Sequence, residues 1–388
     1  MLSRRDDPLD VARHLSRIAI PRRATSLAEA QAAAYIDARL RRAGMQVNAT
    51  PFRAPMHAGL MYPLLALCGL LAALFNGVLP LSMLLVHGIC LILVVADVFL
   101  PGLPIKPRQR DSQNIVGTRA CATDTNTSNQ YASPRWRVIL LAPLDTPRVS
   151  HGLRQCIGWQ RFALAGRFAA AIMLLLLSLG FVLTGQRWWW YAQVLPATYL
   201  ALTVLLSLVP PHAVDQTAAV QGANGALAVL TSSASRLRQL HSVELWTVAL
   251  GATRNGNNGL DDMLTRYPFP PEQTLFIGLE TIDRGDLTCA SPEGLLGQYH
   301  ADPLLLQTVT SLKLADNTYP IVAYPYTHIP SLTLPLHRQR YRALTMMTRK
   351  PPPVSDANVD SISGFDVSML EQATRLVVHL VQALDQTK

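Results

Sequence analysis

The chain has 388 residues, of which 49% are hydrophobic and 15% are charged, and its formal net charge is +9. Charged residues make up about 25% of an ordinary soluble domain, so this composition argues against a purely soluble protein. The five cysteines form no C-x-x-C pair, which argues against a disulfide framework or a cysteine zinc site. The basic residues follow no nucleic-acid-binding motif, and we expect no nucleic-acid partner.

Two helices and a strand are predicted at the start of the chain. Apolar residues recur at helical spacing over residues 10–18. A capping box of Ser26 and Glu29 marks the beginning of a second helix. Gly44 is typical of the residue after a helix, where the backbone often takes a left-handed conformation. Apolar and polar residues then alternate, which predicts a strand that begins at Met45.

Long apolar segments follow in two places. No charged residue lies between Arg53 and Asp97, and Pro80 divides that span into two runs, each about long enough to cross a bilayer. Residues 168–185 and 188–209 are two further uncharged runs. We therefore predict four transmembrane helices in two inserted hairpins, at residues 59–101 and 162–209, and the lipid bilayer as a partner.

The charge distribution predicts the orientation in the membrane. Residues 1–58 contain ten arginines against five acidic residues, and residues 101–161 contain nine Lys or Arg against three. The hairpin turns are almost free of basic residues. By the positive-inside rule we expect a multi-pass integral membrane protein whose hydrophilic part is cytoplasmic.

The remaining segments, 1–58, 102–161 and 210–388, alternate helix and strand signals and predict one α/β domain. The residues from Val138 to Leu141 form an apolar run that suits a strand buried on both faces, and the run stops at Pro143 and Asp145. Further strands are predicted at 113–119, 243–250, 273–280, 319–325 and 331–336, and helices at 223–240 and 366–384.

The order of these elements resembles metallopeptidase family 28, the two-zinc aminopeptidases and carboxypeptidases. The matching stretches are "YIDARLRRAGMQVNATPF", "SQNIVGTR", "VILLAPLDT", "GANGALAVL", "ALGATRNGNNG", "LFIGLETIDRG" and "HIPSLTL". The resemblance covers essentially every hydrophilic part of the chain. It implies a three-layer α/β sandwich around a mixed, mostly parallel sheet.

The family holds two zinc ions with two histidines and three carboxylates, and a glutamate acts as general base. At its "AHxD" strand end this chain has Pro143 in place of the histidine and retains Asp145. The bridging aspartate position falls on Gln221. In the loop that supplies the base and the next ligand, the two glutamates are replaced by Thr253 and Arg254.

Glu280 matches the family's next acidic ligand and is the only ligand position that stays acidic. The last histidine position falls on residues 350–352, Lys-Pro-Pro, with Asp356 downstream. One carboxylate ligand is too few for two zinc ions. We expect no metal and no cofactor, with Asp145 and Glu280 as remnants of the site and Arg254 paired with Glu280.

The resulting hypothesis is a catalytically inactive binding or assembly module, whose partner is a membrane protein complex or a peptide ligand. The alternative is an active zinc aminopeptidase that uses Asp145, Glu280 and a loop histidine. A third class, a small transporter, would need polar residues between the membrane helices, and Asn76, His87, Asp97 and Gln193 are the candidates.

Overall fold

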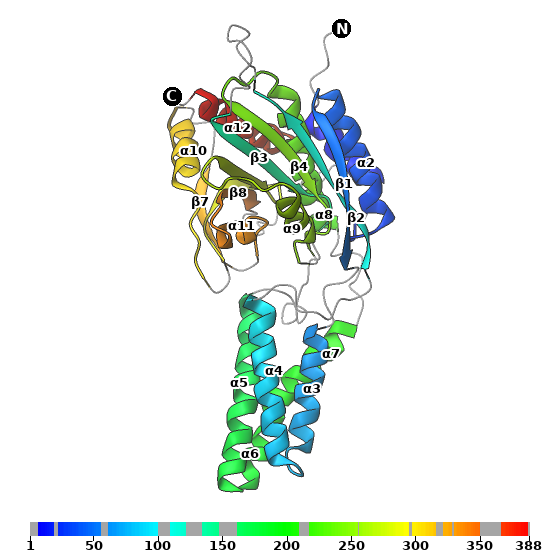
Figure 1. The fold of residues 1–388 in the computed structure, drawn as a ribbon, viewed down its shortest axis with the longest axis vertical. Coiled ribbons are helices and arrows are strands. Elements are labelled where there is room, and N and C mark those ends of the chain that lie inside the picture. Colours follow the sequence, from blue (N-terminus) through cyan, green and yellow to red (C-terminus); the bar gives the residue numbers. More distant parts are fainter. Residues whose placement is uncertain are drawn as a thin grey trace, which may run out of the picture. The chain divides into compact units, whose positions relative to one another are not determined.

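The computed structural model describes residues 7–18, 22–55, 61–99, 109–121, 134–146, 161–208, 217–254, 256–294, 297–315, 321–327, 330–349 and 366–386. The chain divides into two compact units (Figure 1). The sheet unit comprises Met1–Met56, Gln109–Arg148 and Gln216–Lys388. The helical unit comprises His57–Arg108 and Val149–Asp215.

One open sheet of eight strands forms the centre of the sheet unit. The strands are β1 (Gln46–Pro55), β2 (Gln109–Arg119), β3 (Trp136–Pro143), β4 (Val243–Leu250), β5 (Thr274–Leu279), β6 (Asp286–Glu293), β7 (Val322–Tyr326) and β8 (Arg342–Arg349). Their order is β1-β2-β4-β3-β5-β8-β6-β7. β4, β3, β5 and β8 run parallel, as do β6 and β7, while β1, β2 and the β6–β8 pair add antiparallel contacts.

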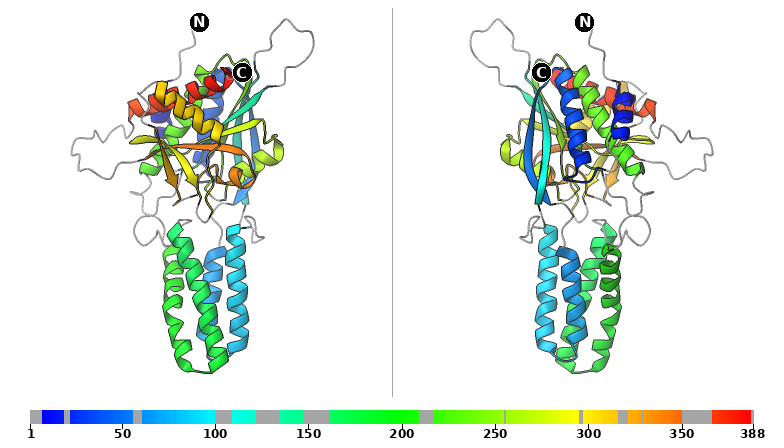
Figure 2. Two further views of the ribbon diagram at one scale, coloured as in Figure 1. Left: turned by 90° about the vertical axis from the view of Figure 1, so that its left-hand side faces the viewer. Right: turned by 90° about the vertical axis from the view of Figure 1, so that its right-hand side faces the viewer.

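Helices cover both faces of this sheet (Figure 2). They are α1 (Pro8–Ile18), α2 (Leu27–Arg42), α8 (Thr217–Arg236), α9 (Asn258–Arg266), α10 (Pro303–Ala315), α11 (Leu334–Arg338) and α12 (Val367–Gln386). α1, α2, α8, α10 and α12 share one hydrophobic core with the sheet, and α9 and α11 share a second. Along β3, Val138 and Leu140 belong to the first core, and Ile139 and Leu141 to the second. A strand buried on both faces therefore explains the continuous apolar run.

The predicted helix signals at the start of the chain are confirmed. Ser26 Oγ accepts a hydrogen bond from the Glu29 N–H at 3.2 Å and caps α2. Gly44 has a φ of 83°, the left-handed conformation expected after a helix.

The predicted strand over 331–336 is wrong. Thr333 is instead the N-cap of α11, and Pro335 lies in the first turn of this helix, where its missing N–H removes no hydrogen bond. β8 and β6, which lie between β5 and the edge strand β7, were not predicted from the sequence. Each strand contains several polar residues among the apolar ones, so apolar periodicity is a weak signal for them.

Five apolar helices form the described part of the helical unit: α3 (Met61–Phe75), α4 (Pro80–Phe99), α5 (Arg161–Thr184), α6 (Arg187–Ala192) and α7 (Val194–Leu208). Aromatic side chains of α6 and α7 pack on glycines. A Cβ atom at Gly180 would lie 2.7 Å from the Trp189 ring, and one at Gly166 would lie 2.3 Å from Tyr199 Oη. Trp190 Nε1 donates to Ala73 O at 3.0 Å and joins the ends of the two hairpins.

Two helical stretches of this unit are long and apolar enough to cross a membrane, Ala163–Thr184 and Arg187–Leu206. The prediction of four such helices is therefore met only in part. Within the described residues, the first hairpin contributes the shorter apolar stretches Pro63–Phe75 and Pro80–Ala96. A bilayer core needs about 20 apolar residues, which these two do not reach. The Asp97 side chain lies outside the described residues.

Candidate functional site

The predicted site residues of the sheet unit meet at one edge of the sheet. β3, β4 and β5 are parallel, so their carboxyl ends lie side by side. Pro143 ends β3, and Asp145 lies two residues after it. Thr253 and Arg254 lie in the loop after β4. Glu280 follows β5 directly. The structure therefore brings these predicted residues to the same end of three neighbouring strands.

Asp145 fixes the loop after β4. Its side chain is buried, and Oδ1 accepts hydrogen bonds from the backbone N–H of Thr253 at 3.1 Å and from the Thr253 hydroxyl. Oδ2 accepts from the backbone N–H of Arg254 at 2.9 Å. Both carboxylate oxygens are thus used by the protein itself.

Glu29 holds the same loop from α2. Its Oε1 accepts from the Ala252 N–H at 2.8 Å, and its Oε2 accepts from the Thr25 N–H at 2.6 Å and from Ser112 Oγ at 3.1 Å. Ala252 has a φ of 47°, a left-handed conformation that costs an L residue about 1–2 kcal/mol. The hydrogen bonds that the loop N–H groups donate to Glu29 and Asp145 offset this strain. Burial and the nearby charge of Asp145 raise the pKa of Glu29 to about 7.

A buried arginine balances these carboxylates. Arg22 Nε donates to Leu144 O at 2.6 Å, and Nη1 donates to Asn224 Oδ1 on α8. Burial lowers the pKa of Arg22 to about 10, although Asp145 and Glu29 oppose this shift. Arg22 and Asn224 were not identified from the sequence, because nothing local shows that residues 202 positions apart will meet.

Arg254 and Glu280 form the ion pair that the sequence predicted. Arg254 Nη1 lies 2.9 Å from Glu280 Oε1, and the exposed fractions of the two side chains are 21% and 1%. Burial raises the pKa of Glu280, and the Arg254 charge opposes this rise. The charge of Glu280 therefore depends on Arg254.

Gln221 lies in α8, but its side chain is outside the described residues, as are Lys350, Pro351, Pro352 and Asp356. The neighbouring Gly225 is required by packing, since a Cβ atom there would lie 1.6 Å from Ile282 O. Gly259 is required in the same way, with its Cβ position 2.1 Å from Gly251 O. Close contacts with backbone oxygen atoms therefore require glycine at both positions.

The described residues at these strand ends do not fit a pair of zinc ions. Pro143 offers no ligand atom, both oxygens of Asp145 are occupied by backbone N–H groups, and Glu280 is bound to a guanidinium. Across the described residues, no group of three or more His, Cys, Asp or Glu side chains is placed to hold a metal ion.

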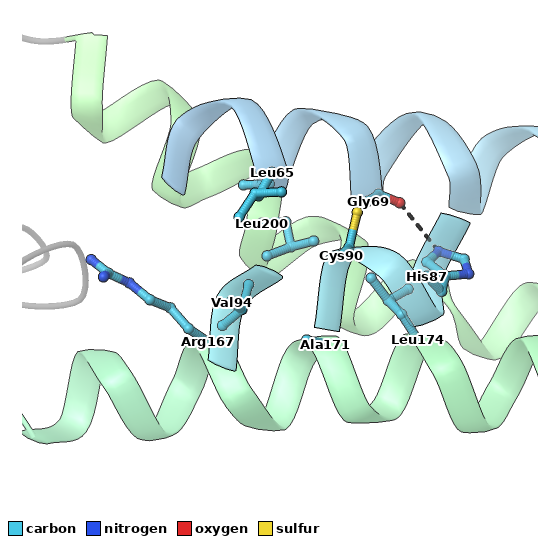
Figure 3. A pocket seen from close by; sticks show the side chains of 10 residues that line it. Leu65, Gly69, His87, Cys90, Val94, Arg167, Ala171, Leu174 and Leu200 are labelled. Carbon is cyan, nitrogen blue, oxygen red and sulfur yellow. Dashed lines mark hydrogen bonds between the residues drawn. The ribbon is translucent and has the colours of Figure 1, made fainter. Parts of the chain in front are cut away.

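A small cavity lies within the helical unit (Figure 3). Its volume is about 20 Å³, and its lining includes His87, Cys90 and the stem of Arg167 among apolar side chains. His87 Nε2 lies 3.4 Å from Gly69 O. A volume of this size holds about one water molecule and no larger solute.

Neither a family model nor a curated protein matches the chain. Solved structures do match it. The aminopeptidase from Aneurinibacillus sp. strain AM-1 is 12% identical with a TM-score of 0.53, over 98% of this chain and 94% of the other. BSAP, a zinc aminopeptidase from Bacillus subtilis, is 11% identical with a TM-score of 0.53, over 98% and 96%. A glutaminyl cyclase from an Acidobacteriales bacterium is 11% identical with a TM-score of 0.50, over 99% and 96%.

These likenesses show the fold, a mixed α/β architecture with an open, mostly parallel sheet of the aminopeptidase kind. At such low identity they carry no statement about ligands or activity. The residues at the carboxyl edge must therefore support any functional conclusion.

The ion pair at this edge predicts a strong energetic coupling. Arg254→Met leaves Glu280 buried without a cation and should lower the free energy of unfolding by about 3 kcal/mol. The double change Arg254→Met with Glu280→Leu should cost less than this single change, because no buried charge remains. Urea unfolding of the four proteins in the cycle measures the coupling, and additive effects would contradict it.

Glu29 predicts a pH dependence of stability. The unfolded chain releases this proton near pH 4.5, whereas the folded chain keeps it to about pH 7. Stability should therefore fall as pH rises between these values and then level off. At about 1.4 kcal/mol per pH unit, the fall is roughly 3 kcal/mol. Urea unfolding across this range should show the fall in the wild type and a smaller one in Glu29→Gln.

Proposed function

We propose that this protein is a membrane-anchored relative of the family 28 metallopeptidases that has lost their catalysis and serves as a binding or assembly module. The observation that carries the proposal is the 2.9 Å ion pair between Arg254 and Glu280 at the carboxyl edge of the sheet. It places a fixed positive charge on the carboxylate that matches a zinc ligand of the family.

The electrostatics of this pair oppose metal binding. A guanidinium repels a divalent cation, and two charges close together in a largely buried site interact strongly. To bind a metal ion, Glu280 would have to give up its ion pair with Arg254. Asp145 would have to give up the N–H groups of Thr253 and Arg254, which would free the strained loop at Ala252.

The proton acceptor of the family's reaction is also missing. Thr253 stands at the position of the general base, and its hydroxyl donates to Asp145. A hydroxyl used in this way does not take a proton from water at neutral pH. The chain thus retains the fold and its required glycines but lacks the groups that would catalyse peptide hydrolysis. This combination is expected of a scaffold or a receptor.

The helical unit supports the anchoring part of the proposal. We propose that residues 59–101 and 162–209 form two hairpins of four membrane helices, and that segments 1–58, 102–161 and 210–388 form the domain outside the bilayer. The excess of basic residues in segments 1–58 and 101–161 favours a cytoplasmic location of that domain. Its partners would be the bilayer and either a membrane protein complex or a peptide ligand.

An active zinc aminopeptidase is the alternative function. It starts from the fold that the chain shares with zinc aminopeptidases. It would require Asp145 and Glu280 to bind one metal ion together with a loop histidine, after Arg254 has turned away. A transporter has less support, because the cavity lined by His87 holds about one water molecule.

Metal content and activity decide between the module and the enzyme. The purified full-length protein, incubated with zinc and then desalted, should hold substoichiometric zinc and should not hydrolyse aminoacyl p-nitroanilides. Stoichiometric zinc with an activity that Glu280→Ala abolishes, and that Glu272→Ala leaves intact, would contradict the proposal. Glu272 is a suitable control because it is an exposed glutamate eight positions earlier in the chain.

The proposed orientation predicts the outcome of protease protection. In inside-out membrane vesicles, added protease should digest segments 102–161 and 210–388, while the two hairpins stay protected. In right-side-out vesicles the same segments should resist digestion. The reverse pattern would show that the domain lies on the other side, and release of the intact protein by alkaline carbonate would exclude a membrane-spanning anchor.

A further inference from the structure

A second buried carboxylate lies near the Arg254–Glu280 pair. Glu293, at the end of β6, is fully buried. Its Oε2 accepts hydrogen bonds from Thr333 Oγ1 at 2.9 Å and from Ser331 Oγ. Thr333 Oγ1 also lies 2.5 Å from Thr345 Oγ1 on β8.

Ser331 and Thr333 belong to residues 330–338, which include α11 and which we call the strap. The strap packs on the end of β5, where a Cβ atom at Gly278 would lie 2.7 Å from the Thr333 methyl group. The backbone of Leu332 lies close enough to Glu280 to lower the pKa of that carboxyl. The strap therefore lies against the same strand end as the ion pair.

The other oxygen of Glu293 faces the far end of the strap. Glu293 Oε1 lies 3.7 Å from His337 Nε2, and the exposed fractions of the two side chains are 0% and 6%. Neither atom has a hydrogen-bond partner among the described residues. The separation is too long for a hydrogen bond and too short for a water molecule between the two atoms.

The surroundings of Glu293 supply no other free cation within the described residues. The groups near Glu293 and His337 are Glu280, Arg254, Cys289, Tyr299 and Tyr326. Arg254 is paired with Glu280, and Tyr299 stacks on the His337 ring. Burial, with a contribution from the charge of Glu293, raises the pKa of Cys289 to about 12 and raises that of Tyr326.

A buried carboxylate without a positive partner is strongly destabilising. The charged form of His337 is the partner within reach, and it completes an ion pair between β6 and α11. When the imidazole is neutral, hydroxyl groups alone hold Glu293. Imidazole is the side chain that ordinarily changes charge between about pH 5 and 8.

We propose that Glu293 and His337 form a proton-dependent latch that holds the strap against the end of β5. Protonation closes the latch, and loss of the proton releases the strap beside Arg254 and Glu280. The statement that this latch controls access to the ligand site rests on the proposed function. The pH-dependent closure of the strap is a separate property, and it can be tested without a ligand.

Hydrogen exchange in the strap tests the latch. The full-length protein is exchanged at pH 5.5 and pH 8, and protection is corrected for the intrinsic exchange rate at each pH. Amides of residues 334, 336 and 337 donate to backbone carbonyls within the strap and report its closure. Their protection should fall about tenfold at the higher pH in the wild type, as expected for the loss of one buried charge pair.

The same measurement on variants identifies the groups responsible. In His337→Gln and Glu293→Gln the change in strap protection should be less than about twofold, because no charge pair forms at either pH. The exposed His241→Gln should keep the wild-type change, since this side chain lies outside the strap. Unchanged protection in the wild type, or a wild-type change in His337→Gln, would overturn the proposal even if Glu293→Gln fails to fold.

Discussion

Charge compensation at the carboxyl edge of the sheet is the constraint on which this structure depends. Asp145, Glu29 and Glu280 are all buried there, and a buried carboxylate persists only when hydrogen bonds or positive charges satisfy it. The charge of Arg22 acts on Asp145 and Glu29, and Arg254 is paired with Glu280. In a metallopeptidase, metal ions supply this positive charge. Here the chain supplies it from its own arginines.

The loop after β4 connects this compensation to the fold. Its backbone N–H groups at Ala252, Thr253 and Arg254 all donate to Glu29 or Asp145. These bonds hold Ala252 in a strained conformation and aim the Arg254 side chain at Glu280. The two acids thus position the guanidinium, and the loss of either would release the loop. A buried carboxylate also holds the strap at the end of β5, because Glu293 contacts it through hydroxyl groups and the His337 imidazole.

Local signals in the sequence predicted much of the fold and one contact of the candidate site, the Arg254–Glu280 ion pair. The capping box at Ser26, the stop at Gly44 and the apolar run of β3 depend on neighbouring residues and were visible in the chain. The pairing of Arg254 with Glu280 followed from two strand ends that had to converge. Arg22, Asn224 and the Glu293–His337 contact could not be predicted, because these residues lie far apart in the sequence and meet only when the elements that carry them pack together. Glu29 was interpreted as a capping residue only, although its carboxylate also accepts hydrogen bonds from two distant segments, at Ser112 and Ala252.

In the proposed function, Arg254 supplies the positive charge of the site in place of a metal ion. The most direct measurement is anomalous X-ray scattering at the zinc edge, from crystals of the full-length protein grown with zinc. These crystals should show no anomalous peak at the ends of β3, β4 and β5, and Arg254 should lie within hydrogen-bond distance of Glu280. A zinc peak bound by Asp145 and Glu280, with the Arg254 side chain turned away, would contradict the proposed function.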